Sequence, residues 1–217
     1  MRQSAVSFDA NGLKIEGVMA QPDAIDGPVP GVVICHPGPL NGGNMDNNVV
    51  LAVSVTLVEH GFATLRFNFR GVGNSQGEHA KGELEHQEPL SAMGFLSDWE
   101  DVDSANLGLA GYSFGTGIIL GSTSLQDQAQ VFALVSPSMA RLEESPLKSN
   151  HRPKFVISGD QDQLIKAPGL EHVLASFEQP FSCEFVPGAD HFWVGQEGMM
   201  AQKVSQFFID HLAKQPA

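Results

Sequence analysis

Short apolar stretches alternate along this chain with longer segments in which apolar residues recur at helical spacing. The short stretches are rich in Val, Ile, Leu and Phe and are bounded by turn-forming residues, which is typical of buried β-strands. The predicted strands cover residues 13–19, 31–35, 63–69, 107–112, 131–135, 154–158 and 181–186. The helical patterns cover residues 48–60, 113–125, 169–177 and 199–212. Strands that alternate with helices predict an α/β protein with a doubly wound, mostly parallel sheet flanked by helices.

The beginning of the chain is expected to differ from the rest. The turn Ala10-Asn11-Gly12 joins two extended segments, and Asn-Gly is a dipeptide of tight antiparallel hairpins, so we predict an antiparallel N-terminal edge. No repeat or linker divides the 217 residues, which predicts one domain over residues 1–217. Only residues 136–153 are available for a cap, so we expect a minimal one, and the polar segment 78–89 is a second place that can shape an entrance.

The pentapeptide Gly111-Tyr112-Ser113-Phe114-Gly115 lies where a predicted strand meets a predicted helix. In that position Gly-x-Ser-x-Gly forms a tight turn that holds the serine hydroxyl away from the sheet. The helix N-terminus favours the negative charge that develops there. Glycine and serine are common in this chain, so the pentapeptide alone is weak evidence and its context must decide.

An acid and a histidine follow two later predicted strands. Asp160 and Asp162 come directly after residues 154–158, and His191 comes after residues 181–186. A serine becomes a strong nucleophile when an imidazole takes its proton and a carboxylate orients that imidazole. We predict Ser113 as nucleophile, His191 as base and Asp162 as acid, in the chain order of an α/β-hydrolase triad. Asp160 is the alternative acid, and either aspartate could instead cap the helix that follows.

The loop that begins at His36 follows another buried strand and carries the third part of the predicted site. Backbone N–H groups in this loop are expected to form an oxyanion hole together with the N–H of Phe114. Pro39 has no N–H, so the second donor is Gly38 or Leu40, and the sequence leaves both open. We expect His36 to be mainly a buried hydrogen-bonding scaffold, with substrate binding as the alternative.

Together these motifs resemble the small, nearly lidless α/β-hydrolases related to dienelactone hydrolases. The resemblance rests on His36-Pro37-Gly38-Pro39, on Leu65-Arg66-Phe67-Asn68-Phe69-Arg70-Gly71-Val72-Gly73 and on the pentapeptide around Ser113, and it covers nearly the whole chain. It implies the α/β-hydrolase fold and cleavage of carboxylic ester or thioester bonds through an acyl-serine intermediate. The second histidine usual in this group is Gly38 here, and the cysteine nucleophile of dienelactone hydrolases is Ser113 here. The resemblance therefore implies neither a role for a second histidine at this position nor the substrate of the dienelactone hydrolases.

The pocket is expected to be shallow and open, which favours small to medium substrates. Its candidate wall residues are Leu40, Phe114, Met139, Leu142 and Trp193, of which Met139 and Trp193 are also candidate substrate-binding residues.

Arg70 follows a predicted strand in the neighbourhood of the site. Its guanidinium could bind a substrate carboxylate or brace an acid such as Glu83, and we favour the structural role.

Composition narrows the partners. A formal net charge of −13 argues against nucleic acid and anionic membranes, because both would repel the chain. Cys35 and Cys183 lie in strands expected to be far apart, so we predict no disulfide and a reducing cytoplasm. We find no signal-peptide or transmembrane pattern. We expect a cytoplasmic monomer or homodimer that acts on a small-molecule ester or thioester, without cofactor or metal.

Four alternatives remain at this point. The same triad could serve a peptidase or an acyltransferase, and a chain of this fold could be a non-catalytic binding module. A nucleotide-binding oxidoreductase is weakly indicated by Gly71-Val72-Gly73-Asn74-Ser75-Gln76-Gly77, whose third glycine comes one residue late for the dinucleotide fingerprint.

Overall fold

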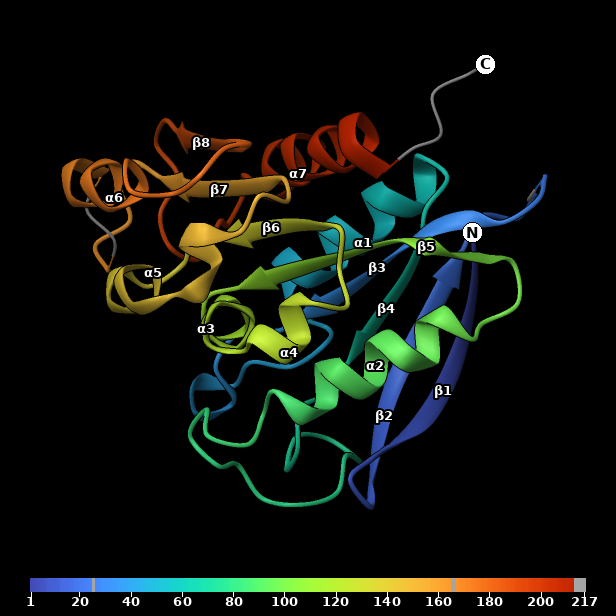
Figure 1. Ribbon diagram of the computed structural model, residues 1–217. Coiled ribbons are helices and arrows are strands. Elements are labelled where there is room, and N and C mark those ends of the chain that lie inside the picture. Colours follow the sequence, from blue (N-terminus) through green and yellow to red (C-terminus); the bar gives the residue numbers. More distant parts are fainter. Residues whose placement is uncertain (25, 165–166, 213–217) are drawn as a thin grey trace.

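The computed structural model describes residues 1–24, 26–164 and 167–212. One eight-stranded sheet runs through the molecule in the order β1-β2-β4-β3-β5-β6-β7-β8 (Figure 1). The strands are β1 (Arg2–Ala10), β2 (Leu13–Gln21), β3 (Val29–Cys35), β4 (Ala63–Phe67), β5 (Val102–Tyr112), β6 (Val131–Val135), β7 (Lys154–Gly159) and β8 (Phe181–Val186). β1 and β2 form the expected antiparallel hairpin, β2 is antiparallel to β4, and the remaining neighbours are parallel. The predicted sheet is therefore confirmed.

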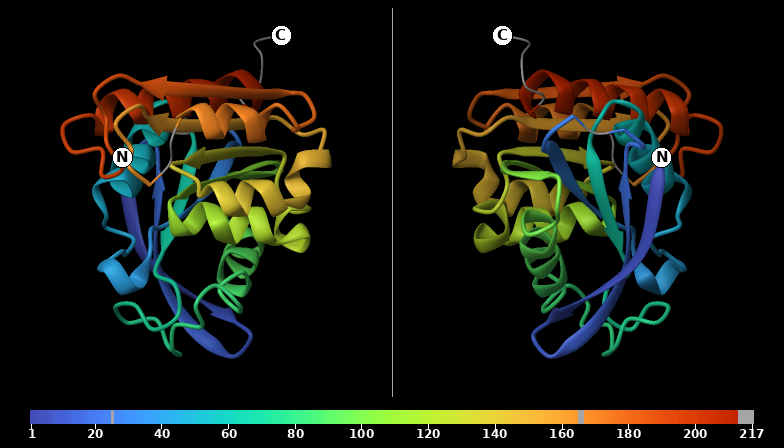
Figure 2. Two further views of the ribbon diagram at one scale, coloured as in Figure 1. Left: turned by 90° about the vertical axis from the view of Figure 1, so that its left-hand side faces the viewer. Right: turned by 90° about the vertical axis from the view of Figure 1, so that its right-hand side faces the viewer.

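Helices cover both faces of the sheet, as Figure 2 shows from two sides. The helices are α1 (Asn48–Glu59), α2 (Gln87–Ser97), α3 (Phe114–Gly121), α4 (Thr123–Gln126), α5 (Met139–Glu144), α6 (Ala167–Leu174) and α7 (Glu197–Leu212). Two short 3₁₀ turns add η1 (Pro39–Asn41) and η2 (Pro146–Ser149). α1 and α7 bury their apolar residues against one face, and α2, α3, α5 and α6 do so against the other. Because both faces are covered, the central strands β4, β6 and β7 are buried along their whole length.

The sequence missed α2 and misjudged the next helix. In α2 the residues Met93 and Leu96 are buried at a spacing of three, but Gly94 and the polar first turn weaken that pattern. The helix predicted over 113–125 is two helices, because Ser122 has extended backbone angles and its side chain accepts a hydrogen bond from the N–H of Leu125. Ser122 therefore ends α3 and caps α4.

Within the described ranges, none of the helices is both long enough and apolar enough to cross a lipid bilayer.

Candidate active site

Ser113 lies in the turn between β5 and α3 with φ 52° and ψ −111°, a conformation that L-residues rarely adopt. The two outer glycines of the pentapeptide allow this turn. A Cβ on Gly111 would lie 2.8 Å from the backbone of Gly115 and of Thr116. A Cβ on Gly115 would lie 2.4 Å from the carbonyl oxygen of Cys35 in β3. The close packing of α3 on β3 thus holds the serine in its strained position.

A continuous hydrogen-bonded chain leads from Ser113 into the protein. The Oγ of Ser113 lies 3.0 Å from the Nε2 of His191, and the Nδ1 of His191 lies 2.8 Å from the Oδ2 of Asp162. Ser113 follows β5, Asp162 follows β7 and His191 follows β8, so the carboxyl ends of parallel strands at one edge of the sheet bring the three side chains together. The Asp162 side chain is fully buried, whereas 12% of the His191 side chain is exposed. The geometry suits transfer of the serine proton to a carboxylate-oriented imidazole.

Ser136, at the end of β6, belongs to the same network and was not predicted from the sequence. Its Oγ accepts a hydrogen bond from the indole N–H of Trp193 at 3.1 Å, and its hydroxyl donates to Asp162. Burial raises the pKa of Asp162, but His191, the N–H of Leu164 and the Ser136 hydroxyl together bring that pKa below its usual value. The carboxylate is therefore held in its ionised form. Ser136 has a positive φ of 49°, an unusual backbone conformation that the sequence does not indicate.

The other two aspartates near the histidine support the loops. Asp160 accepts a hydrogen bond from the N–H of Gly188 at 2.8 Å, and Asp190 accepts from the N–H groups of Phe192 and Trp193. Asp160, the alternative acid, therefore stabilises the loop that leads to the histidine.

The expected oxyanion donors line the same pocket as the serine. In the described part of the chain, the N–H groups of Gly38, Leu40 and Phe114 make no hydrogen bond to protein acceptors. Gly38 has φ −54° and ψ 119°, which any residue can adopt, and a Cβ there would make only ordinary contacts, at 3.6 Å to Asn41 and 3.8 Å to Phe114. The glycine that close approach requires in this loop is Gly43, where a Cβ would lie 2.2 Å from the carbonyl oxygen of Pro37.

Ser113 and His191 lie between two open pockets. The first pocket, of about 360 Å³, is lined by Gly38, Pro39, Leu40, Asn41, His79, Phe114, Gly117, Ile118, Ser136, Ser138, Arg141 and Leu164 besides these two residues. The second pocket, of about 420 Å³, includes Gly43, Asn47, Tyr112, Leu164 and Phe192. The side chains of Leu40, Leu164 and Phe192 are largely exposed at the rim. An ester needs room on both sides of its carbonyl carbon, and the two pockets provide it.

Three of the candidate wall residues do not reach these pockets. Trp193 is completely buried in the core between the sheet and α7, where it supports Ser136. Leu142 is also completely buried, and Met139 packs against the other apolar core. A Cβ on Gly169 of α6 would touch the end of the Met139 side chain at 3.4 Å. The predictions for Trp193, Leu142 and Met139 are therefore wrong, because these apolar side chains pack into or against the core instead of lining a pocket.

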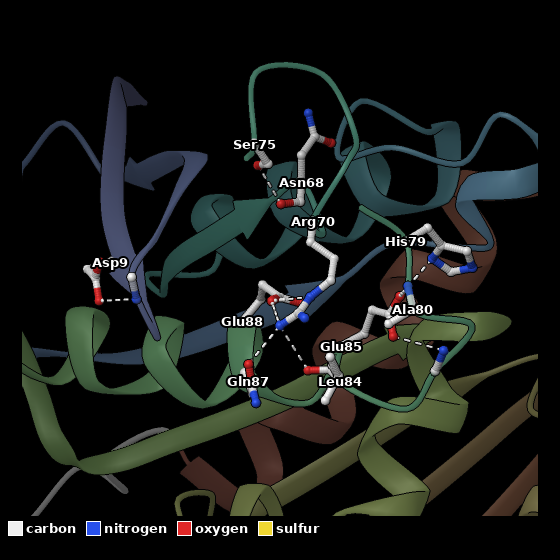
Figure 3. Close-up of polar contacts among 12 residues, drawn as sticks. Asp9, Asn68, Arg70, Ser75, His79, Ala80, Leu84, Glu85, Gln87 and Glu88 are labelled. Carbon is white, nitrogen blue, oxygen red and sulfur yellow. Dashed lines mark hydrogen bonds and ion pairs between the residues drawn. The ribbon is translucent and has the colours of Figure 1, made fainter. Parts of the chain in front are cut away.

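Arg70 is buried and does not line either pocket. Its Nε and Nη2 donate to Oε1 of Glu88 at 2.8 and 2.6 Å, and its Nη2 also donates to Gln87 and to the carbonyl oxygen of Leu84 (Figure 3). The substrate-binding alternative is therefore wrong for Arg70. The favoured structural role holds, although the partner is Glu88 rather than Glu83.

His36 is completely buried beneath the loop that it begins. Its Nδ1 lies 2.6 Å from the carbonyl oxygen of Pro37, and its Nε2 accepts the N–H of Phe69 at 3.0 Å. Burial lowers the pKa of His36 to about 4, so the ring is neutral and each nitrogen has one backbone partner. This arrangement corresponds to the scaffold role, and the substrate-binding alternative for His36 is wrong.

The sequence also missed His79 and Arg141, which line the first pocket. Both lie in segments without regular hydrophobic spacing, and only the folded arrangement brings them into the lining of the pocket that contains the serine.

Solved α/β serine hydrolases from bacteria are similar in fold to this chain. No protein-family model matches it. An uncharacterized protein of Rickettsia prowazekii is 28% identical over 212 residues, which cover 94% of this chain and 88% of that protein. The structure of an α/β serine hydrolase homologue from Coxiella burnetii is 28% identical, with a TM-score of 0.82 and coverage of 94% and 96% of the two chains. A serine hydrolase without a lid from Xanthomonas campestris is 26% identical, with a TM-score of 0.85 and coverage of 99% and 97%.

Proposed function

We propose that this chain, a member of the α/β-hydrolase superfamily, is a serine hydrolase that cleaves carboxylic ester or thioester bonds through an acyl-serine intermediate. The observation that carries this proposal is the hydrogen-bonded chain Asp162–His191–Ser113, which ends at a strained serine between two open pockets. Both distances in this hydrogen-bonded network, from Ser113 to His191 and from His191 to Asp162, are within hydrogen-bonding range.

In the proposed reaction the Ser113 hydroxyl attacks the carbonyl carbon while its proton passes to Nε2 of His191. Asp162, bound to Nδ1, fixes the imidazole orientation and stabilises the imidazolium. The oxyanion accepts hydrogen bonds from the N–H of Phe114 and from Gly38 or Leu40. The bond from the carbonyl carbon to the leaving oxygen or sulfur then breaks, and the imidazolium gives that atom its proton, so that it departs as an alcohol or thiol. Water attacks the acyl-serine in a second step, with His191 again as base, and releases the acid.

We also propose that the substrates are small to medium in size, because the site is open. We further propose that the protein is cytoplasmic, because the buried thiol of Cys35 suits a reducing compartment.

The test is labelling with a fluorophosphonate probe together with turnover of 4-nitrophenyl butyrate. We expect labelling and turnover in the wild type and neither in Ser113→Ala, because the probe forms a bond only with an activated serine. His191→Ala should lose labelling while it keeps the wild-type fold. Ser4→Ala, in the exposed edge strand β1, is the matched control and should behave as wild type. A folded wild type without labelling would refute the proposal and favour a non-catalytic binding module.

A further inference from the structure

Arg141 of α5 lies along α3, and it lines both the first pocket and a neighbouring surface pocket. A Cβ on Gly117 would lie 3.5 Å from Cγ of Arg141, and a Cβ on Gly121 would lie 3.8 Å from its Nη1. These glycines are four residues apart, so they lie on one face of α3 and leave room for the long side chain. The guanidinium also extends toward Gly82, where a Cβ would lie 3.6 Å from Nη2. Arg141 thus links α5, α3 and the 79–85 loop at the pocket wall.

This guanidinium has no carboxylate partner among the described residues. The ion-paired arginines there are Arg66 with Asp46, Arg70 with Glu88 and Arg152 with Asp127. The chain carries 25 acidic and 12 basic residues, so an arginine held only for structure would find a carboxylate easily. Glu83 lies with Arg141 in a neighbouring surface pocket, but the two form no ion pair within the described ranges. The positive charge of Arg141 is therefore available to a ligand.

His79 lines the same pocket, from a loop built around a buried carboxylate. Glu85 is completely buried, and its two oxygens accept the N–H groups of Ala80 at 2.6 Å and Gly82 at 2.8 Å. Oε1 of Glu85 also lies 2.7 Å from Nδ1 of His79, an ion-pair contact rather than a well-aligned hydrogen bond (Figure 3).

The other side of the His79 ring faces Phe114, with ring centroids 5.5 Å apart. The Nε2 of His79 makes no hydrogen bond within the described part of the chain, and 15% of the side chain is exposed. The loop therefore fixes the ring in the pocket wall and leaves one ring nitrogen for a ligand. Gly82, whose N–H helps to hold Glu85, is also the residue that Arg141 approaches.

We propose that Arg141 and His79 form an anion-binding subsite, and that the substrates are esters or thioesters whose acyl chain ends in a carboxylate. This inference rests on the proposed function. The apolar side chains of Leu40, Phe114 and Ile118 line the same pocket as the serine and the two charged residues, which suits the methylene chain of such an acyl group. The planar guanidinium of Arg141 binds the carboxylate through parallel hydrogen bonds, and the imidazolium form of His79, whose Nδ1 faces Glu85, donates one more from Nε2.

The kinetic test compares mono-(4-nitrophenyl) adipate with its methyl ester, which has the same acyl chain without the charge. At 0.15 M salt, which screens the net charge of the protein, we expect kcat/KM to favour the charged ester by about tenfold. Arg141→Gln should abolish this preference, Arg141→Lys should keep part of it, and His79→Gln should reduce it. Arg2→Gln removes one charge from the edge strand β1 and should leave the preference unchanged. Equal kcat/KM values for the two esters in the wild type, or an undiminished preference in Arg141→Gln, would overturn the subsite.

A binding measurement separates the subsite from the reaction. Titration calorimetry on Ser113→Ala should give a dissociation constant about tenfold lower for the charged ester, and the same preference should disappear in Ser113→Ala/Arg141→Gln. If this preference is present but the wild type neither reacts with fluorophosphonate nor turns over esters, the subsite stands and the proposed hydrolase function fails. If the wild type turns over both esters equally and Ser113→Ala binds them equally, the hydrolase function stands and the subsite fails.

Discussion

The substitution Gly115→Ala is expected to damage both stability and activity, because it adds one methyl group where α3 crosses β3. The new Cβ would lie 2.4 Å from the carbonyl oxygen and 2.8 Å from the Cβ of Cys35. The carbonyl oxygen belongs to the backbone of a central strand, so it cannot rotate away from the new methyl group. Restoring an ordinary contact moves the start of α3 by about 1 Å.

Overpacking of this kind costs about 2 kcal/mol of unfolding free energy. The shift also moves Ser113, two residues away, relative to His191, whose Nε2 lies 3.0 Å from the Ser113 Oγ. A displacement of about 1 Å between reacting groups lowers rates by about a hundredfold. We therefore expect kcat/KM for 4-nitrophenyl butyrate to fall by about that factor.

Gly94→Ala is the matched control, since it is the same substitution in the exposed middle of α2 with no atom within 4 Å of the new Cβ. It should raise the unfolding free energy by about 1 kcal/mol, because alanine favours the helix over glycine, and leave activity unchanged. Urea denaturation and ester turnover of the three proteins provide the test. If Gly115→Ala is as stable and as active as Gly94→Ala, the argument that packing of α3 on β3 positions the serine is wrong.

Three further predictions concern buried polar groups. Between pH 6.5 and about 4 the unfolded chain binds a proton at His36 that the folded chain does not, so the unfolding free energy should fall by up to about 3 kcal/mol as the pH falls. His36→Gln should lack this slope in urea titrations at pH 7.0, 5.5 and 4.5, and an unchanged slope would contradict the burial argument. Arg70→Met leaves the buried carboxylate of Glu88 without its cation and should cost about 3 kcal/mol in denaturation, while the preference between charged and neutral esters stays unchanged. Ser136→Ala removes a donor to Asp162 and should lower kcat about tenfold with little change in KM; a wild-type kcat would exclude a positioning role for Ser136.

The sequence predicts the sheet well because its strands are apolar runs bounded by turn residues. It also predicts that Ser113, Asp162 and His191 meet, since each directly follows a strand and parallel strands end at one edge of the sheet. Their catalytic roles remain predictions until they are tested in solution.

What the sequence did not reveal depends on contacts between distant segments. Arg70 pairs with Glu88, which lies in the first turn of α2, and a helix that was not predicted could not be expected to supply a partner. His79 enters the pocket because the buried carboxylate of Glu85 gathers backbone N–H groups of the intervening loop. Trp193 was predicted to line the pocket wall, but it is buried in the core, and a left-handed backbone angle, φ 62°, accompanies this burial.

Gly38 is a position in the site where residues other than glycine can be accommodated. Its dihedral angles suit any amino acid, and a side chain there would begin at ordinary contact distance from Asn41 and Phe114. A new side chain at this position would enter the first pocket beside the serine without disturbing Gly43, on whose small size the loop depends. Gly38 is therefore a site where a single codon change can give the pocket a different shape or charge while the architecture stays intact. For laboratory evolution toward new acyl groups, it is the first position to randomise.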